Sequence, residues 1–359
     1  MRIVQLLESF APGDAISNSV TALARLCRTA GKQADVVAAH VHPRVGDVAV
    51  PFGQYRWAEV GPGDLLLFHH SIGTELVSRL PRLPGCKVLV YHNVTPAHYF
   101  AGVNAGVERE ARKGRRQLRQ LRRMDFIATV SDSRFNRAEL EDLGFAGNHV
   151  VPILLEPDRL AATSPDPRLL SALDDGTVNW LFVGRLAPNK RQDDLIAVFA
   201  HYQRHVNPRS RLLLVGSGSG MEPYTRRLEV QVNDLKIRDH VMFLGRVSLP
   251  QLVACYRSAH VFVGMSEHEG FCVPLAESML FDVPIVAFAA GSVPETLGGA
   301  GILVRSKDPA IVSEIAHLAA TDAPLRQKLL AAQRSRLSAL SSDKVGKTWL
   351  ELLENLSGR

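Results

Sequence analysis

Short apolar runs alternate with longer segments of helical periodicity along almost the whole chain. In the first half these runs are nearly continuous, and they predict strands at Ile3–Leu7, Asp35–Ala39, Leu65–Phe68, Val88–Tyr91 and Phe126–Val130. Continuous apolar strands are typical of a parallel sheet covered by helices on both faces. A helix is predicted over Ile16–Thr29, because polar residues open this segment and Gly31 follows its end.

The same rhythm restarts after Leu154–Asp175, a stretch with three prolines that we interpret as a linker. Further strands are predicted at Trp180–Val183, Leu212–Val215, Val241–Leu244, Val261–Val263 and Ile285–Phe288. Helices are predicted at Asp193–Arg204, Met221–Asn233 and Val273–Phe281. Two successive βαβ systems predict an α/β protein with two doubly wound, parallel-sheet domains, residues 1–155 and 176–343, and a cleft between them.

The composition excludes several classes of protein. Of the 359 residues, 46% are hydrophobic and 22% are charged, which is typical of a globular chain and not of a disordered one. No apolar run is long enough for a transmembrane helix and no signal peptide is apparent, so we expect a cytoplasmic protein. The four scattered cysteines form no CxxC pair, which argues against a zinc ribbon or a redox motif. The net charge of +6 permits an anionic partner without selecting one.

The first candidate site follows the strand that ends at Val183. Gly184 permits a ligand to come close to the backbone. Arg185 and Lys190 can bind a diphosphate, the first as a planar fork and the second as a mobile point charge. The alternative interpretation is a solvated basic loop before a helix.

The second candidate site is Ser266–Glu277, where a strand runs into a polar loop and a helix opens near Pro274. The free N–H groups of that helix start suit a phosphate or sugar oxygens. Glu269 lies in the loop, and Glu277 lies on the helix, where a carboxylate can accept hydrogen bonds from vicinal hydroxyls. The alternative is a capped helix with two surface acids. A third motif, Gly291–Glu295, is a turn after the next strand, and its acid is either functional or simple loop polarity.

Together these three motifs resemble glycosyltransferase family 4, a large group of retaining enzymes with the GT-B fold. The resemblance rests on a strand followed by GR-x4-K, on E-x7-E with Gly and Phe after the first Glu, and on the later G-S-x-P-E turn, over residues 178–300. In the first half, Pro12–Ser17 with Gly13 resembles the family's glycine loop. His92 resembles the family histidine near the transferred sugar, and Val130–Ser133 resembles a turn before the helix on the linker side.

The resemblance implies two Rossmann-like domains, the first for the acceptor and the second for a nucleotide diphosphate sugar. It implies that a C-terminal helix, within residues 344–359, crosses back to the first domain. It also implies a retaining, metal-independent hexosyl transfer with no cofactor besides the donor. The candidate catalytic residues are Glu269, His92, Arg185 and Lys190. The candidate donor-binding residues are Gly13, Gly184, Arg185, Lys190, Gly216, Arg246, Val247, Gly270, Phe271, Cys272, Val273 and Glu277.

The acceptor side is indicated by a basic helix and by weaker resemblances. Arg109–Arg123 carries eight cations and few acids, which is typical of a helix that lies on an anionic bilayer, although a solvated helix is the alternative. His69 and His70, at another strand end, are further acceptor candidates. The segments around Gly13 and His92 resemble bacterial enzymes that build surface polysaccharides, such as lipopolysaccharide, on polyprenyl carriers. On that basis we expect a GDP-linked mannose donor first and a UDP-hexose next, at the inner face of the plasma membrane if the helix binds it.

Two other functions fit part of the pattern. A nucleotide-sugar epimerase of the same fold would consume donor without an acceptor. A non-catalytic nucleotide-sugar-binding protein would bind the donor and never turn it over. The presence of both Glu269 and Glu277, with both Arg185 and Lys190, argues against a degenerate site. Nucleic acid is not an expected partner, because no aromatic residues interleave with the basic ones.

Overall fold

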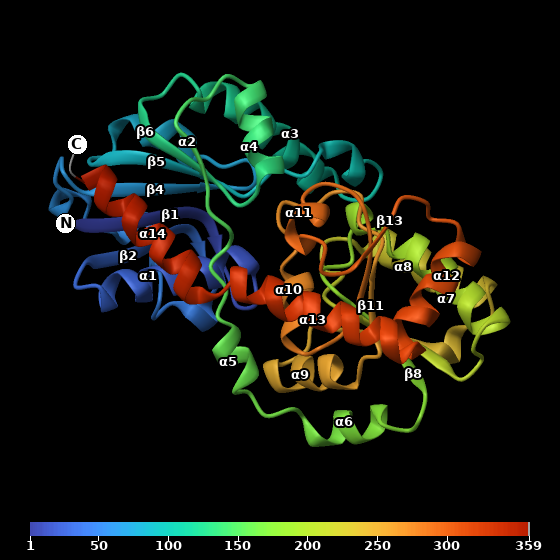
Figure 1. The fold of residues 1–359 in the computed structure, drawn as a ribbon. Helices are drawn as coiled ribbons and strands as arrows, with labels where there is room; N and C mark the ends of the chain where they lie inside the picture. Colours follow the sequence, from blue (N-terminus) through green and yellow to red (C-terminus); the bar gives the residue numbers. More distant parts are fainter. Residues whose placement is uncertain (358–359) are drawn as a thin grey trace. The chain divides into compact units, whose positions relative to one another are not determined.

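The computed structural model describes residues 1–357 and divides into two compact α/β units (Figure 1). Unit 1 comprises Met1–His98, Gly106–Glu156 and the chain from Leu340, and unit 2 comprises Tyr99–Ala105 and Pro157–Ala339. The fold class predicted from the sequence is confirmed, since each unit is built on its own parallel sheet. The last two positions of the predicted 344–359 segment lie outside the described residues.

Unit 1 contains a seven-stranded parallel sheet of order β3-β2-β1-β4-β5-β6-β7. Its strands are β1 (Arg2–Phe10), β2 (Gln33–Val41), β3 (Val50–Pro51), β4 (Leu65–His70), β5 (Cys86–Tyr91), β6 (Phe126–Ser131) and β7 (Asn148–Val150). All six residues of β4 are buried, which explains its continuous apolar run. The order reverses between β1 and β4, and ligands of such sheets bind at this switch point, beyond the carboxyl ends of the strands.

Helices cover both faces of the unit 1 sheet. They are α1 (Ala15–Thr29), α2 (Leu76–Arg79), α3 (Ala105–Leu121), α4 (Arg134–Asp142) and α14 (Ser342–Ser357). One core layer joins the sheet to α1 and α14 through Leu23, Trp349 and Leu353. The other joins it to α3 and α4 through Leu118 and Leu140. In Figure 1, α14 is the red helix that packs beside α1, so the C-terminal segment returns to the first sheet.

Unit 2 contains a six-stranded parallel sheet of order β10-β9-β8-β11-β12-β13. Its strands are β8 (Val178–Val183), β9 (Ser210–Val215), β10 (Val241–Gly245), β11 (Val261–Gly264), β12 (Ile285–Phe288) and β13 (Ile302–Val304). Its helices are α5 (Pro157–Ala161), α6 (Pro167–Leu173), α7 (Gln192–His205), α8 (Glu222–Asp234), α9 (Leu249–Ser258), α10 (Val273–Leu280), α11 (Val293–Leu297), α12 (Pro309–Thr321) and α13 (Ala323–Ala339). The switch point of this sheet lies between β8 and β11.

The linker prediction for Leu154–Asp175 is wrong for most of its length. Residues 157–161 and 167–173 are helical, and the chain from Pro157 belongs to unit 2. The side chain of Asp166 caps α6 by accepting from the amide of Leu169 at 2.9 Å, and its own amide donates to the carbonyl of Pro250 at 2.9 Å. The short strands β3, β7 and β13 were also missed, because two or three residues are too few to show a period.

Candidate functional site

The loops that follow β8 and β9 approach each other backbone to backbone. Gly184 has φ 153° and its amide donates to the carbonyl of Val215 at 2.9 Å. Gly216 has φ 147°, and a Cβ placed there would lie 2.0 Å from the carbonyl oxygen of Gly184. Only glycine fits this position. The two glycines therefore set the backbone course at one side of the switch point in unit 2.

The loops after β8 and β11 are joined across the switch point. The amide of Glu267 donates to the carbonyl of Asn189 at 2.9 Å, and the side-chain amide of Asn189 donates to the carbonyl of His268 at 3.1 Å. Lys190 Nζ donates to Glu269 Oε2 at 2.5 Å. The Glu269 side chain is 7% exposed and that of Lys190 is 23% exposed. The structure thus brings together one cation and one acid that the sequence placed in separate motifs.

The third motif, Gly291–Glu295, is hydrogen-bonded to the backbone of the second motif, Ser266–Glu277. The amide of Ser292 donates to the carbonyl of Glu269 at 3.1 Å, and the Thr296 hydroxyl donates to the carbonyl of Phe271 at 2.5 Å. Gly291 has φ +56°, and a Cβ there would lie 2.7 Å from the Glu269 carbonyl oxygen. This turn and α11 therefore hold the backbone of the Glu269 loop in place. The backbone carbonyl of Glu295, the acid of this motif, accepts a hydrogen bond from Arg336 at 2.9 Å.

Helix α10 begins after a residue in an uncommon conformation. Its N-cap, Cys272, has φ 67°, in the left-handed region that side chains other than glycine rarely adopt. Pro274 lies in the first turn, as predicted. Glu277 on this helix accepts a hydrogen bond from the hydroxyl of Tyr256 on α9 at 2.6 Å. Burial raises the pKa of Glu277, and the bond from Tyr256 partly opposes this rise.

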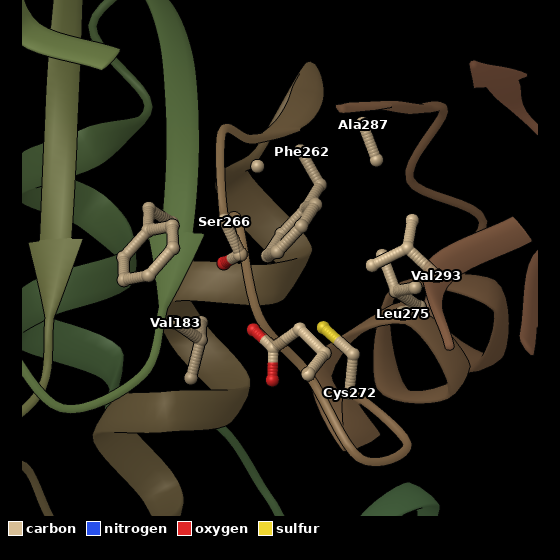
Figure 2. Close-up of a pocket in the computed structure, with 10 residues that line it drawn as sticks. Val183, Phe262, Ser266, Cys272, Leu275, Ala287 and Val293 are labelled. Carbon is tan, nitrogen blue, oxygen red and sulfur yellow. The ribbon is translucent and has the colours of Figure 1, made fainter. Parts of the chain in front are cut away.

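A small pocket lies beside the paired loops of unit 2. Its lining residues come from the ends of β8, β11 and β12 and from the starts of α10 and α11: Phe182, Val183, Phe262, Gly264, Ser266, Glu269, Cys272, Leu275, Ala287 and Val293. Figure 2 shows Val183, Ser266 and Cys272 on facing sides of this space. Burial and the neighbouring Glu269 carboxylate raise the pKa of the Cys272 thiol. The thiol therefore stays protonated. The Glu269 carboxylate and the Ser266 hydroxyl are polar groups in a lining that is otherwise mostly apolar.

A second ionic network adjoins Lys190, and sequence reasoning missed it. Arg191 pairs with Asp193, Asp194 and Glu267 at 2.8–3.0 Å. Lys307 pairs with Asp194 at 2.6 Å and with Glu267 at 2.7 Å. Burial raises the pKa of the Glu267 carboxyl, but the two cations outweigh burial and the net pKa is lowered. These pairs fix the β8 loop, whose Arg191 adopts φ 52°, against the β11 loop.

The remaining predicted donor residues are distributed along the same edge of the unit 2 sheet. Arg185 is exposed in the loop after β8, and its carbonyl accepts from Gln192 at 3.1 Å. Gly270, Phe271 and Val273 belong to the loop and first turn beside Glu269. The amide of Gly216 donates to the carbonyl of Gly245, the residue before the Arg246-Val247 turn, at 2.9 Å, so this turn lies beside Gly216. That turn follows β10, two strands away from β8, and Val247 packs on the hydrophobic core.

In unit 1, the predicted glycine loop lies between β1 and α1. Gly13 has φ 71°, and the next residue, Asp14, caps α1 by accepting from the amide of Ser17 at 2.8 Å. The loop follows β1 and therefore lies at the carboxyl edge of the unit 1 sheet, at the switch point. The roles assigned to Gly13 and to the histidines of this edge stay predictions.

Three polar side chains meet at the carboxyl ends of β4, β5 and β6. His92 Nδ1 lies 2.8 Å from Asp132 Oδ2, and His92 Nε2 lies 2.8 Å from His69 Nδ1. The two imidazole rings are nearly parallel, with 6° between their planes and 5.1 Å between their centroids. His70 turns away and bonds the carbonyl of Gly114 at 3.1 Å. Burial lowers the pKa of His69 well below its usual value and lowers that of His70 to about 4, so both are neutral at pH 7.

The whole chain has the GT-B fold of known solved structures. It matches sucrose-phosphate synthase from Thermosynechococcus elongatus with a TM-score of 0.77, 19% identity and 99% of each chain covered. It matches the Anabaena Alr3699/HepE structure in complex with UDP-glucose with a TM-score of 0.76 and 19% identity, covering 99% of this chain and 100% of that one. At these identities the likeness shows the fold.

Residues 171–336 match the model of the family described as glycosyl transferases group 1. A D-inositol 3-phosphate glycosyltransferase of Xylanimonas cellulosilytica is 27% identical over 204 residues, which are 56% of this chain and 48% of that protein. A GDP-mannose-dependent phosphatidylinositol monomannoside mannosyltransferase of Mycolicibacterium smegmatis is 31% identical over 212 residues, 54% of this chain and 52% of that protein. The chain spans about half the length of these curated relatives. Together the comparisons show the GT-B fold for the whole chain and a likeness to glycosyl transferases group 1 for residues 171–336, the part of the chain that carries the predicted motifs.

Proposed function

We propose that the protein transfers a hexose, with retention of configuration, from a nucleotide diphosphate sugar to a glycan or a polyprenyl-linked acceptor in polysaccharide biosynthesis. The observation that carries this proposal is the Lys190–Glu269 pair, held at 2.5 Å at the switch point of the unit 2 sheet. A cation for a diphosphate and an acid for sugar hydroxyls lie side by side, next to the N-terminus of α10. The family match of this segment supports the same assignment.

The roles of the site residues follow from their charge and position. Arg185 and Lys190 provide positive charge for the diphosphate and stabilise the negative charge that develops on the departing nucleotide, without a metal. Glu269 accepts hydrogen bonds from the transferred sugar. Glu277 accepts from the ribose hydroxyls, and its bond from Tyr256 holds the carboxylate in place.

The donor is proposed from the names of the relatives. A relative that is 31% identical over half of this chain is named GDP-mannose-dependent, so GDP-mannose is the first candidate. A UDP-hexose is the second, because a protein of the same fold was solved with UDP-glucose. The two differ in the base, so a nucleotide series distinguishes them before any sugar is tested.

The test is thermal stabilisation by GDP, UDP, ADP and TDP, followed by product analysis. A ligand at one hundred times its Kd stabilises the native state by about 2.7 kcal/mol. We expect one nucleotide to raise the Tm of the wild type and of Lys328→Ala, an exposed-lysine control in unit 2, but not that of Lys190→Ala. A nucleotide that shifts all three proteins equally would contradict the assignment of the diphosphate to Lys190.

Product analysis with the sugar nucleotide and a polyprenyl-linked or glycan acceptor then separates the three functions. Mass spectrometry of an acceptor heavier by one hexose supports transfer, and NMR of its anomeric centre tests retention. An epimerised donor formed without acceptor would instead identify an epimerase. Tight donor binding without turnover under either condition would identify a non-catalytic binding protein.

A basic face of helix α3 supports a membrane-proximal acceptor as part of the same proposal. Arg109, Arg112, Arg116 and Arg119, here called the arginine stripe, are all exposed and recur at intervals of three and four residues. This spacing aligns them on one side of the helix, opposite the buried Ala111, Gly114, Leu118 and Leu121. Such a face is suited to anionic lipid headgroups. No helix among the described residues is long and apolar enough to cross a bilayer.

A further inference from the structure

In unit 1, the His92 side chain links those of His69 and Asp132 through two side-chain hydrogen bonds. The side chains of His92 and Asp132 are each 4% exposed, and His69 is 5% exposed as a residue. The three come from the ends of neighbouring strands β4, β5 and β6, so the sheet itself sets their spacing. Both ring nitrogens of His92 are engaged at 2.8 Å, one by each neighbour.

Which nitrogens carry protons in this hydrogen-bonded series, Asp132–His92–His69, follows from the donors and acceptors available. An ionised carboxylate only accepts, so the proton shared with Asp132 belongs to Nδ1 of His92. With that proton on Nδ1, His92 Nε2 has a lone pair and accepts a hydrogen bond from the Nδ1–H of His69. His69 is neutral because burial disfavours its charged form. Its outer nitrogen, Nε2, is buried with no partner among residues 1–357, and the chain of hydrogen bonds ends there.

We infer that Asp132 and His69 are positioning residues for His92, which they hold as the Nδ1–H tautomer with Nε2 directed at His69. In water a neutral histidine favours the opposite, Nε2–H tautomer, so Asp132 reverses the ordinary preference. The kinetic part of this inference rests on the proposed function, because it assumes that His92 serves the transfer. The tautomer itself is a property of the free protein and needs no substrate.

The deciding experiment is 15N NMR of the imidazole rings in protein labelled at histidine, without ligand, at pH 8. We expect His92 to show a protonated Nδ1 and an unprotonated Nε2 in the wild type and in Asp125→Asn, an exposed control in the same unit. In Asp132→Asn the carboxylate is gone, and the two nitrogens of His92 move toward the Nε2–H tautomer. The Nε2–H tautomer in the wild type, or unchanged signals in Asp132→Asn, overturns the inference.

A kinetic measurement follows once transfer has been observed. In Asp132→Asn we expect kcat to fall by about 10–100-fold with little change in the KM for the donor, by analogy with the loss when the partner that orients a metal-bound imidazole is removed. Asp125→Asn should retain wild-type kcat. Unchanged kcat in Asp132→Asn overturns the kinetic part. If no donor is turned over by any variant, the proposed function fails while the NMR result still decides the tautomer.

Discussion

At the residue scale, Gly291 shows how the candidate site depends on a glycine that is not among the proposed donor-binding residues. Its φ of +56° and the 2.7 Å approach to the Glu269 carbonyl exclude a side chain on two separate grounds. The backbone of Glu269 is in turn held by the Ser292 amide. The position of the Glu269 carboxylate is therefore decided partly by a turn 22 residues further along the chain.

We expect Gly291→Ala to weaken both stability and nucleotide binding. The positive φ costs about 1–3 kcal/mol and the overpacking against Glu269 about 1–3 kcal/mol more. Gly299→Ala is the matched control, because Gly299 also has a positive φ, +85°, but a Cβ there meets nothing within 4 Å. Urea unfolding and nucleotide-induced Tm shifts measure the two effects. Equal losses of stability and of binding in both variants would show that contact with Glu269 is unimportant.

Glu277 gives stability a specific pH dependence. Its pKa is raised in the folded state by burial, so the unfolded chain loses this proton first, near pH 4.3. The native state is then penalised increasingly as the pH rises from there through the raised folded pKa. We therefore expect the difference in free energy of unfolding, Glu277→Gln minus wild type, to become more positive as the pH rises from 4 to 7, as measured by urea titration. A constant difference across that range would contradict the raised pKa.

At the scale of elements, the strands of both sheets were predictable because burial on both faces leaves continuous apolar runs. The error at residues 154–175 arose from reading prolines only as linker residues. Pro157 and Pro167 are the first residues of α5 and α6, where the missing N–H costs nothing. Asp166 immediately before Pro167 was the local signal for a helix start.

The candidate site was predictable to the extent that its residues follow strand ends in recognisable motifs. Lys190 and Glu269 were found in this way, although their pairing was not. Lys307 pairs with Asp194 and Glu267 from 113 and 40 residues away, and no local pattern marks such a partner. Tyr256 could not be predicted as a site residue either. In the sequence, an apolar-face tyrosine on a helix indicates a core position, and only the structure shows that its hydroxyl donates to Glu277.

The C-terminal helix α14 is expected to stabilise unit 1 specifically. Trp349 is 4% exposed and belongs to the core layer shared with α1. Trp349→Ala should cost about 3–5 kcal/mol. It should raise amide hydrogen exchange in peptides from β1, β2 and α1. Trp180→Ala, in the core of unit 2, is the reciprocal control and should raise exchange in β8 and β9. Equal exchange increases in both units for either variant would show that the units do not open separately.

At the scale of the whole molecule, the seven-stranded and the six-stranded parallel sheet share one feature, a single switch point in the strand order. In each unit the chain reverses its strand order once, and polar side chains gather at the carboxyl ends of the strands near that point. Unit 2 places an ion pair and a helix N-terminus there, which suits an anionic donor. Unit 1 places two histidines, His69 and His92, and the carboxylates of Asp132 and Glu8 there, which suits hydroxyl groups rather than phosphate. The division of chemistry proposed for donor and acceptor agrees with this difference in charge.

The arginine stripe extends this argument from small ligands to a surface. Its four arginines contribute positive charge on one face of α3, and each cation near an anionic bilayer contributes about 1 kcal/mol. Replacing Arg109, Arg116 and Arg119 by Gln should therefore lower binding to phosphatidylglycerol vesicles by about two orders of magnitude in co-sedimentation at low salt, and added salt should abolish the wild-type binding. Replacing the exposed Arg226, Arg257 and Lys328 of unit 2 by Gln removes the same charge elsewhere. Equal losses in the two triple variants would mean that net charge, and not this helix face, determines attraction to the membrane.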